Sequence, residues 1–286
     1  MTFHQHPTTY TKHVQLIVAD LSRSTIFYES IIGLRILKQT PSVVNFTANG
    51  QDALLTIEQS TGKNKPLSNA AGLYHMAFLV PTKKELGTVF NHIHSSGYPF
   101  SGASDHKVSE ALYLNDVDGN GIEIYYDRSP DQWNWQNGDV EMTVDPLNIE
   151  SLVASAEEAI WNGIPAGTVM GHIHLRVANL AEAETFYVQG LGFDVVNRYG
   201  TQAMFISSNG YHHHIALNVW GRPNAIDRNE HTLGLKSYSI VYPSDQARQK
   251  VVGQLQGIGA TVSVQSDFVS AIDPSGIVVQ MFVGKI

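Results

Sequence analysis

An internal repeat limits the folds open to this chain of 286 residues more than any other feature. Several short segments of the first half recur about 159 residues later in the second half: VADL at 18–21 as VANL at 177–180, FY at 27–28 as FY at 186–187, and NG at 49–50 as NG at 209–210. The chain therefore consists of two homologous copies joined in tandem.

Each half divides again into two similar parts. A strand followed by a helix and further strands is predicted to begin near Thr11, Gly72, Met170 and Gly234. The helices have apolar residues at a spacing close to 3.6, as at Leu86, Val89, Phe90 and Ile93. Four βαβββ modules in two tandem domains predict an α+β protein whose curved mixed or antiparallel sheets form cups.

The repeat also sets the expected domain boundaries. We predict an N-terminal domain over 9–130 and a C-terminal domain over 169–286. The linker between them, 131–168, is rich in acidic and small residues and is predicted to contain a helix near 149–162.

Composition excludes several classes of protein. With 43% hydrophobic and 15% charged residues, the chain has the composition of a soluble globular protein. A net charge of −8 without a basic run argues against nucleic acid as a partner. The absence of cysteine excludes disulfides, thiolate metal sites and cysteine nucleophiles. No segment approaches 18 apolar residues, so we expect no membrane partner and a cytoplasmic location.

Three residues of the first half have the chemistry of a metal site. His13 and His75 each begin an apolar run at matching places in two modules, and Glu123 lies in a β-rich run after the turn at 118–120. Strand alternation puts these side chains on the face opposite the apolar residues, so they would point into a cup. Two imidazoles and one carboxylate are the ligands of the facial triad that binds Fe(II). We therefore predict a metal site formed by His13, His75 and Glu123.

The second half lacks most of this set. Ser237 corresponds to His75 and Gln280 corresponds to Glu123, so that only His172 remains. We therefore expect the C-terminal domain to keep the cup and to have lost the metal.

A histidine triplet precedes the apolar run at 215–217. If alternation holds, His212 and His214 share one face and could approach His172. The triplet is explained either by a hydrogen-bonded cluster at a strand end or by a second metal site or small-molecule pocket. The sequence leaves both readings open.

The stretch DHKVSEALYLNDVDGNGIE at 105–123, continued by DRSP at 127–130 and Trp133, resembles the vicinal oxygen chelate superfamily of glyoxalases, bleomycin resistance proteins and extradiol dioxygenases. The resemblance covers nearly the whole chain, and its length is similar to that of the catechol 2,3-dioxygenase branch. It implies an Fe(II)-dependent dioxygenase acting on a catechol-like aromatic substrate and dioxygen, with Mn(II) or another divalent metal as the alternative ion. Members of the family often associate through their sheets, so a homo-oligomer is compatible with it.

The resemblance also implies two catalytic residues. Tyr113 lies ten residues before Glu123, a spacing similar to that of an active-site tyrosine of extradiol enzymes. His106 lies near the place of a supporting histidine of the family. We expect both to assist proton transfers. Extradiol enzymes also use a histidine as acid and base, and no histidine of the first module matches it.

Two other functions remain open. A glyoxalase-type isomerase or lyase needs a fourth protein ligand, which Glu58 could supply if the alignment that puts Thr56 at that place shifts by one residue pair. A non-catalytic resistance protein binds small molecules in an apolar cup, usually without a metal triad.

Overall fold

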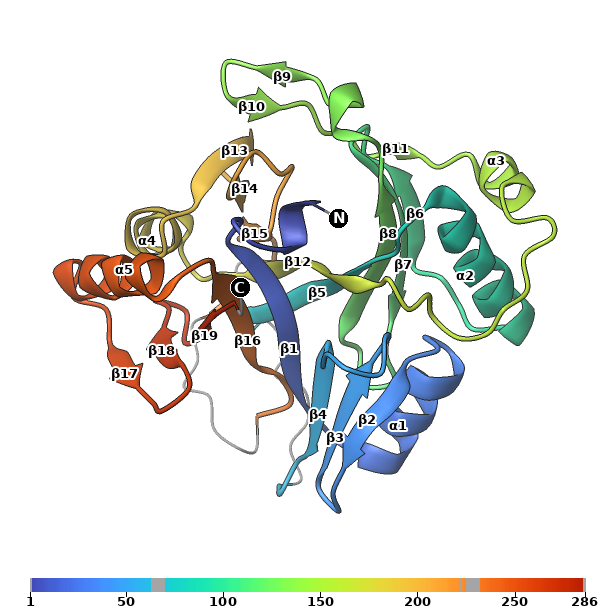
Figure 1. The fold of residues 1–286 in the computed structure, drawn as a ribbon, viewed down its shortest axis with the longest axis horizontal. Helices are drawn as coiled ribbons and strands as arrows, with labels where there is room; N and C mark the ends of the chain where they lie inside the picture. The colour runs from blue at the N-terminus through green and yellow to red at the C-terminus, as the bar shows by residue number, and fades with distance from the viewer. Residues whose placement is uncertain (1, 63–69, 222, 225–231, 285–286) are drawn as a thin grey trace.

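A computed structural model describes residues 2–62, 70–221, 223–224 and 232–284 (Figure 1). Its four modules each consist of a strand, a helix and three further strands, which confirms the predicted α+β fold. The first half contains β1 (Tyr10–Val18), α1 (Leu21–Ser30), β2 (Arg35–Gln39), β3 (Val43–Thr47) and β4 (Leu55–Gln59), then β5 (Gly72–Leu79), α2 (Lys83–Ser96), β6 (Gly102–Asp105), β7 (Ser109–Asn115) and β8 (Gly121–Asp127).

The second half repeats this order. Its third module contains β12 (Val169–Arg176), α4 (Leu180–Glu184) with a π-helical turn η3 (Thr185–Gly190), β13 (Asp194–Tyr199), β14 (Ala203–Ser207) and β15 (Ile215–Asn218). The fourth contains β16 (Gly234–Tyr242), α5 (Asp245–Gly257), β17 (Val262–Val264), β18 (Val269–Ile272) and β19 (Val278–Val283).

Short elements precede and join the halves: η1 (Thr2–His4), η2 (Pro130–Gln132), β9 (Trp135–Gln136), β10 (Asp139–Val140), β11 (Asp145–Pro146) and α3 (Ile149–Ala154). Helix α3 is shorter than the helix predicted near 149–162. Ala156 is the one buried residue of the segment 155–162 that follows it, so a longer helix would bury little more apolar surface. No helix in the described part of the chain is both long and apolar enough to cross a membrane.

Helix α2 shows how local sequence fixes the ends of an element. The Thr82 hydroxyl accepts a hydrogen bond from the backbone N–H of Glu85 and donates one to its carboxylate, and Gly97 ends the helix with φ of 74°. The buried face includes Leu86, Val89 and Ile93, as the apolar spacing predicts.

Each sheet combines strands of both halves. The eight-stranded sheet has the order β17-β18-β19-β16-β1-β4-β3-β2, and the nine-stranded sheet has the order β11-β6-β7-β8-β5-β12-β15-β14-β13. Strands β1 and β16 pair antiparallel, as do β5 and β12. The first module therefore pairs with the fourth, and the second pairs with the third.

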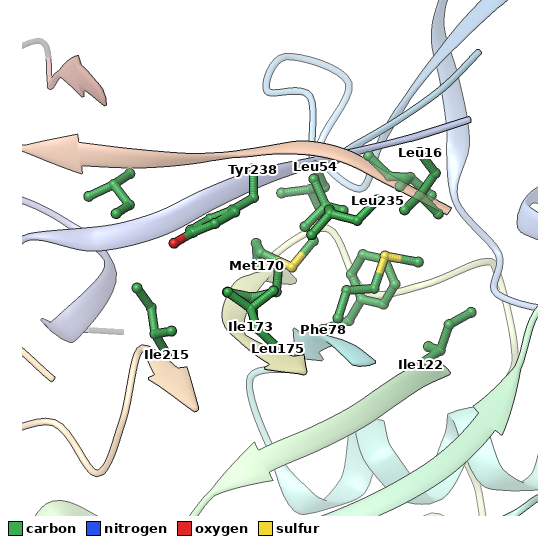
Figure 2. Close-up of a cluster of buried hydrophobic side chains, with 14 of the residues drawn as sticks. Leu16, Leu54, Phe78, Ile122, Met170, Ile173, Leu175, Ile215, Leu235 and Tyr238 are labelled. Carbon is green, nitrogen blue, oxygen red and sulfur yellow. The ribbon is translucent and has the colours of Figure 1, made fainter. Parts of the chain in front are cut away.

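The main core lies between the central strands of the two sheets. Figure 2 shows Leu16, Leu235 and Tyr238 of the eight-stranded sheet facing Met170 and Phe78 of the other. Because side chains alternate along a strand, the polar residues of these strands point away from this core. The two polar faces consequently lie on opposite sides of it.

Candidate metal centre and its cavity

Three side chains from three strands meet on the polar face of the nine-stranded sheet. His75 comes from β5, Glu123 from β8 and His172 from β12. Glu123 Oε2 lies 2.9 Å from His75 Nε2 and 3.0 Å from His172 Nε2. All three residues are buried, and one ligand atom of each lies within 4.8 Å of the others.

Strand register explains why they meet. Ala77 of β5 pairs with Glu123 on one side and with His172 on the other, so that the three side chains share a face. Because the side chain of Ala77 is small, the side chains of Glu123 and His172 can approach each other over it. His75 precedes Ala77 by two residues and therefore extends from the same face.

The prediction that His13 joins His75 and Glu123 is wrong. His13 lies in the eight-stranded sheet, where its Nε2 is 2.7 Å from the Thr56 hydroxyl. The two sheets pack through their apolar faces, so His13 points away from the nine-stranded sheet. His172, its counterpart in the third module, takes its place.

The eight-stranded sheet carries the same arrangement with other residues. His13 pairs with Ser239, which pairs with Gln280, while Ser237 occupies the position equivalent to that of His75. The predicted correspondences of Ser237 and Gln280 are therefore found in the strand register. The set that lacks metal ligands therefore contains His13 and not His172. The reason is that the first module shares a sheet with the fourth, and the second shares a sheet with the third.

The electrostatics of the group suit a cation. Burial alone would raise the pKa of Glu123, but the charges and hydrogen bonds of His172 and His75 hold it well below its usual range. Burial lowers the pKa of His172 against the opposing effect of Glu123. Two imidazole rings and one carboxylate, buried together, form a ligand set that fits a divalent ion with open positions.

The group lies in the wall of a large cavity. The cavity has a volume of about 1140 Å³, and the described residues that line it include Tyr113, His106, His213, Arg176 and Trp220. A cavity of this size accommodates a small organic molecule.

Tyr113 and His106 form a hydrogen-bonded pair in this wall. His106 Nδ1 donates to the Thr143 carbonyl at 2.5 Å, so its Nε2 accepts from the Tyr113 hydroxyl at 2.6 Å. Burial and the charge of Glu123 raise the pKa of Tyr113 well above its usual range. Tyr113 is therefore a neutral phenol whose oxygen can still accept a hydrogen bond from a ligand.

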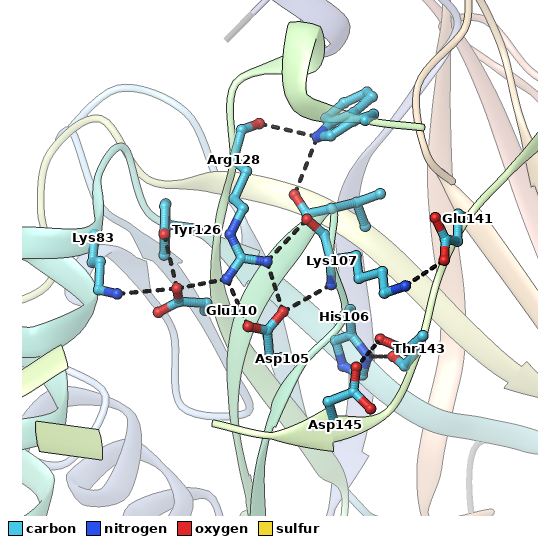
Figure 3. A network of polar contacts seen from close by, with 12 residues as sticks. Lys83, Asp105, His106, Lys107, Glu110, Tyr126, Arg128, Glu141, Thr143 and Asp145 are labelled. Atoms are coloured by element: carbon cyan, nitrogen blue, oxygen red, sulfur yellow. Dashed lines mark hydrogen bonds and ion pairs between the residues drawn. The ribbon is translucent and has the colours of Figure 1, made fainter. Parts of the chain in front are cut away.

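An ion-pair network supports this wall from outside. Arg128 donates to Asp105 at 2.6 and 2.7 Å and to Glu110 at 2.8 Å (Figure 3). Glu110 also binds Lys83 at 3.0 Å. The network ties β6, β7 and the end of β8 together, and the loop after β6 carries His106.

A second chain of hydrogen bonds approaches the cavity from the histidine triplet. His212 Nε2 lies 2.7 Å from Asp127 Oδ1, and its Nδ1 lies 2.8 Å from His213 Nδ1. When the ring proton of His212 is on Nε2, facing the Asp127 carboxylate, its Nδ1 is the acceptor. His213 then donates through Nδ1, which leaves its Nε2 unprotonated.

The triplet does not alternate as predicted. The ring centroid of His172 lies 4.2 Å from that of His213 but 6.4 Å from that of His212. His214 instead donates from Nε2 to the Phe3 carbonyl at 3.0 Å. The reason is that β15 begins at Ile215, so the triplet is not part of a regular strand.

The predicted ligand set thus left out His172, and alternation put His212 and His214, not His213, beside it. His172 was identifiable, because it lies 159 residues after His13 and shares its position in the module. His213 belongs to the triplet that the sequence singles out, but its orientation was not predictable, since it depends on a hydrogen bond to His212 outside a regular strand.

Comparison with known proteins agrees with this architecture. The model of the Glyoxalase/Bleomycin resistance protein/Dioxygenase superfamily matches residues 11–124 and again 169–280. The chain belongs to this superfamily. It is also 38% identical to the catechol-2,3-dioxygenase of Bacillus subtilis (strain 168) over 272 residues, which cover 94% of this chain and 95% of the relative.

Two solved structures share the fold at low sequence identity. A candidate dioxygenase from Bacillus subtilis has a TM-score of 0.66 at 14% identity and covers 98% of this chain and 86% of its own. Glyoxalase I from Zea mays has a TM-score of 0.58 at 16% identity and covers 99% of this chain and 95% of its own. The superfamily therefore fixes the fold, while the function is decided by the residues of the site.

Proposed function

We propose that this chain is an extradiol-type dioxygenase that opens the ring of a catechol-like substrate with dioxygen. The observation that carries the proposal is the buried group of His75, Glu123 and His172 in the wall of a cavity that also contains His213 and Tyr113. The 38% identity to a catechol-2,3-dioxygenase over most of the chain supports it.

His75, His172 and Glu123 would hold the metal. We propose Fe(II), with Mn(II) as the substitute, because imidazole and carboxylate ligands suit both ions. When bound, the metal lowers the pKa of a catechol hydroxyl and supplies the redox chemistry that dioxygen requires.

The other residues of the cavity handle protons. The unprotonated Nε2 of His213 accepts a proton from a catechol hydroxyl and later returns it to a departing oxygen. Tyr113, held by His106, orients the diol through the phenol oxygen. The carbon–carbon bond beside the diol breaks and both atoms of dioxygen enter the ring-opened product, so that no further reductant is needed.

Glu58, the residue that could supply the fourth ligand of the glyoxalase-type alternative, is not among the described residues that line the cavity. Glu58 lies in the eight-stranded sheet, where its Oε2 accepts from Lys236 at 2.5 Å and from Gln15 at 3.0 Å. Among the described residues that line the cavity, Glu123 is the one carboxylate. The donor set of three also argues against a resistance protein that binds its ligand without metal.

Oxygen uptake tests the proposal. Protein reconstituted anaerobically with Fe(II) is given catechol and substituted catechols, and uptake is expected to match a yellow ring-opened product. His172→Ala should abolish both signals, whereas His13→Ala, the matched change in the other sheet, should retain them. Absence of uptake from protein that holds one metal per chain would overturn the proposed reaction.

A further inference from the structure

The cavity contains a cation that the chemistry of the diol does not use. Arg176 follows His172 and His174 on β12 at intervals of two residues, so all three extend from the same face. All three line the cavity. Arg176 therefore lies on the wall that carries the metal ligands, further along the strand.

The surroundings of Arg176 set it apart from the other arginines. Its guanidinium carbon lies 5.1 Å from the centroid of the Tyr74 ring, and its Nε is buried without a hydrogen-bond partner. Every other arginine in the described part of the chain donates to an oxygen: Arg23 to Asp118, Arg35 to the Ala48 carbonyl, Arg128 to Asp105 and Glu110, Arg198 to Glu184 and Arg248 to Asp245. Arg176 alone among them has no such acceptor.

Partial burial of a guanidinium costs free energy when its N–H groups have no hydrogen-bond acceptor. A ligand that supplies an acceptor removes this cost. Glu123, the one carboxylate among the described residues lining the cavity, is already bound by His75 and His172. A planar guanidinium with free donors matches a carboxylate in two parallel hydrogen bonds. The arginine end of the cavity is thus suited to an anion, although the whole chain carries a net charge of −8.

The dimensions of the cavity point to a substrate larger than catechol. Four residues of strand separate the Cα atoms of Arg176 and His172 by about 13 Å. Tyr74 and Trp220, whose ring centroids lie 5.3 Å apart, supply aromatic surface beside the arginine. A single ring held at the metal ligands would leave much of the 1140 Å³ unfilled.

We propose that Arg176 binds a carboxylate on the part of the substrate remote from the diol, so that the preferred substrates are catechols with an acidic side chain. This inference rests on the proposed function and names its substrate class. Arg176 is here a specificity-determining residue and takes no part in the proton transfers.

The test compares acidic and neutral catechols of the same shape. We would measure kcat/KM for 3-(3,4-dihydroxyphenyl)propanoate and its 2,3-dihydroxy isomer, each against the corresponding primary amide. Wild type should prefer an acid to its amide, and Arg176→Met should lose about tenfold to hundredfold in kcat/KM for the acid alone, as expected for a charge-assisted hydrogen bond. Arg248→Met, which changes a half-buried arginine on α5, should leave the ratio unchanged.

Binding measured without turnover separates this inference from the proposed reaction. Calorimetry with 3-phenylpropanoate and its amide should show tighter binding of the acid to wild type, and Arg176→Met should abolish the difference. Equal binding of acid and amide to wild type would overturn the inference without requiring any variant to fold. If the acid binds through Arg176 but no catechol is cleaved, the anion site stands and the dioxygenase proposal fails.

Discussion

The hydroxyl of Tyr28 donates a 2.7 Å hydrogen bond to Oδ2 of Asp116, joining the helix of the first module to the turn between β7 and β8 of the second. Tyr187 repeats this contact with Asp273 at 3.1 Å in the second half. Asp116 also accepts from the backbone N–H groups of Asp118 and Asn120 and so organises the turn that leads into the strand of Glu123.

Tyr28→Phe should therefore destabilise the protein. The change leaves a buried carboxylate oxygen with one partner fewer, and the free energy of unfolding is expected to fall by about 1–3 kcal/mol. Urea unfolding measures it. Tyr98→Phe is the matched control, because the Tyr98 hydroxyl donates to the more exposed Asn115 carbonyl and its loss should cost less. Equal losses in the two variants would contradict the role assigned to the buried contact.

The repeats of which these contacts are part were visible in the sequence, and they sufficed to predict four modules. Which modules share a sheet was not predictable, because β1 and β12 occupy equivalent positions in their modules and both offer a histidine to the polar face. The choice is made by the packing of whole sheets over long sequence separations, which alternation within a strand does not encode. As a result, the prediction from sequence grouped His75 with Glu123, as the structure does, but named His13 where the structure has His172.

Metal binding distinguishes these two histidines directly. His172→Ala should lower the affinity for Fe(II) or Mn(II) at least a hundredfold, whereas His13→Ala should retain one ion per chain. Metal analysis after dialysis gives the stoichiometry. Because a bound ion stabilises the folded state, a chelator should lower the Tm of wild type and of His13→Ala but not that of His172→Ala. Loss of metal from His13→Ala with full retention in His172→Ala would reverse the assignment.

His13 should instead make stability depend on pH. Burial, assisted by the charge of Lys12, lowers the pKa of His13 to about 4, against an ordinary value of 6.5 in the unfolded chain. Between these values the unfolded chain binds a proton that the folded protein excludes, so stability decreases as the pH falls. The contribution is fully present above pH 6.5 and is lost as the pH falls through about 4, to a total of about 3 kcal/mol.

Urea unfolding at several pH values tests this dependence. His13→Gln removes the titrating group and should lose less stability than wild type between pH 6.5 and pH 4. His94→Gln, which removes an exposed imidazole on α2, should behave as wild type does. Parallel pH curves for wild type and His13→Gln would show that burial does not suppress protonation of His13.

Gly171, next to His172, has a packing role at the candidate metal site. A Cβ on Gly171 would overlap the Tyr125 hydroxyl and lie 2.8 Å from Leu79 Cβ. Gly171→Ala should therefore cost about 1–3 kcal/mol of stability and weaken metal binding by displacing β12 from β5. Gly253→Ala on α5 is the control, since its Cβ meets open space and should stabilise the helix by about 0.5–1 kcal/mol. Unfolding curves and metal titrations of both variants give the two quantities. Wild-type stability and metal affinity in Gly171→Ala would show that β12 accommodates the added Cβ.

Asp127 fixes the tautomer on which the proposed role of His213 depends. Asp127→Asn can turn an amide N–H toward His212 Nε2, and this reverses the order of donors so that the proton of His213 moves to Nε2. We expect kcat to fall about a hundredfold, since general acid–base catalysis contributes factors of this size, while KM and metal content stay near the wild-type values. Asp131→Asn, on the exposed η2, should leave kcat unchanged. A parallel loss of metal in Asp127→Asn would mean that Asp127 supports the fold around His172 and not the orientation of the base.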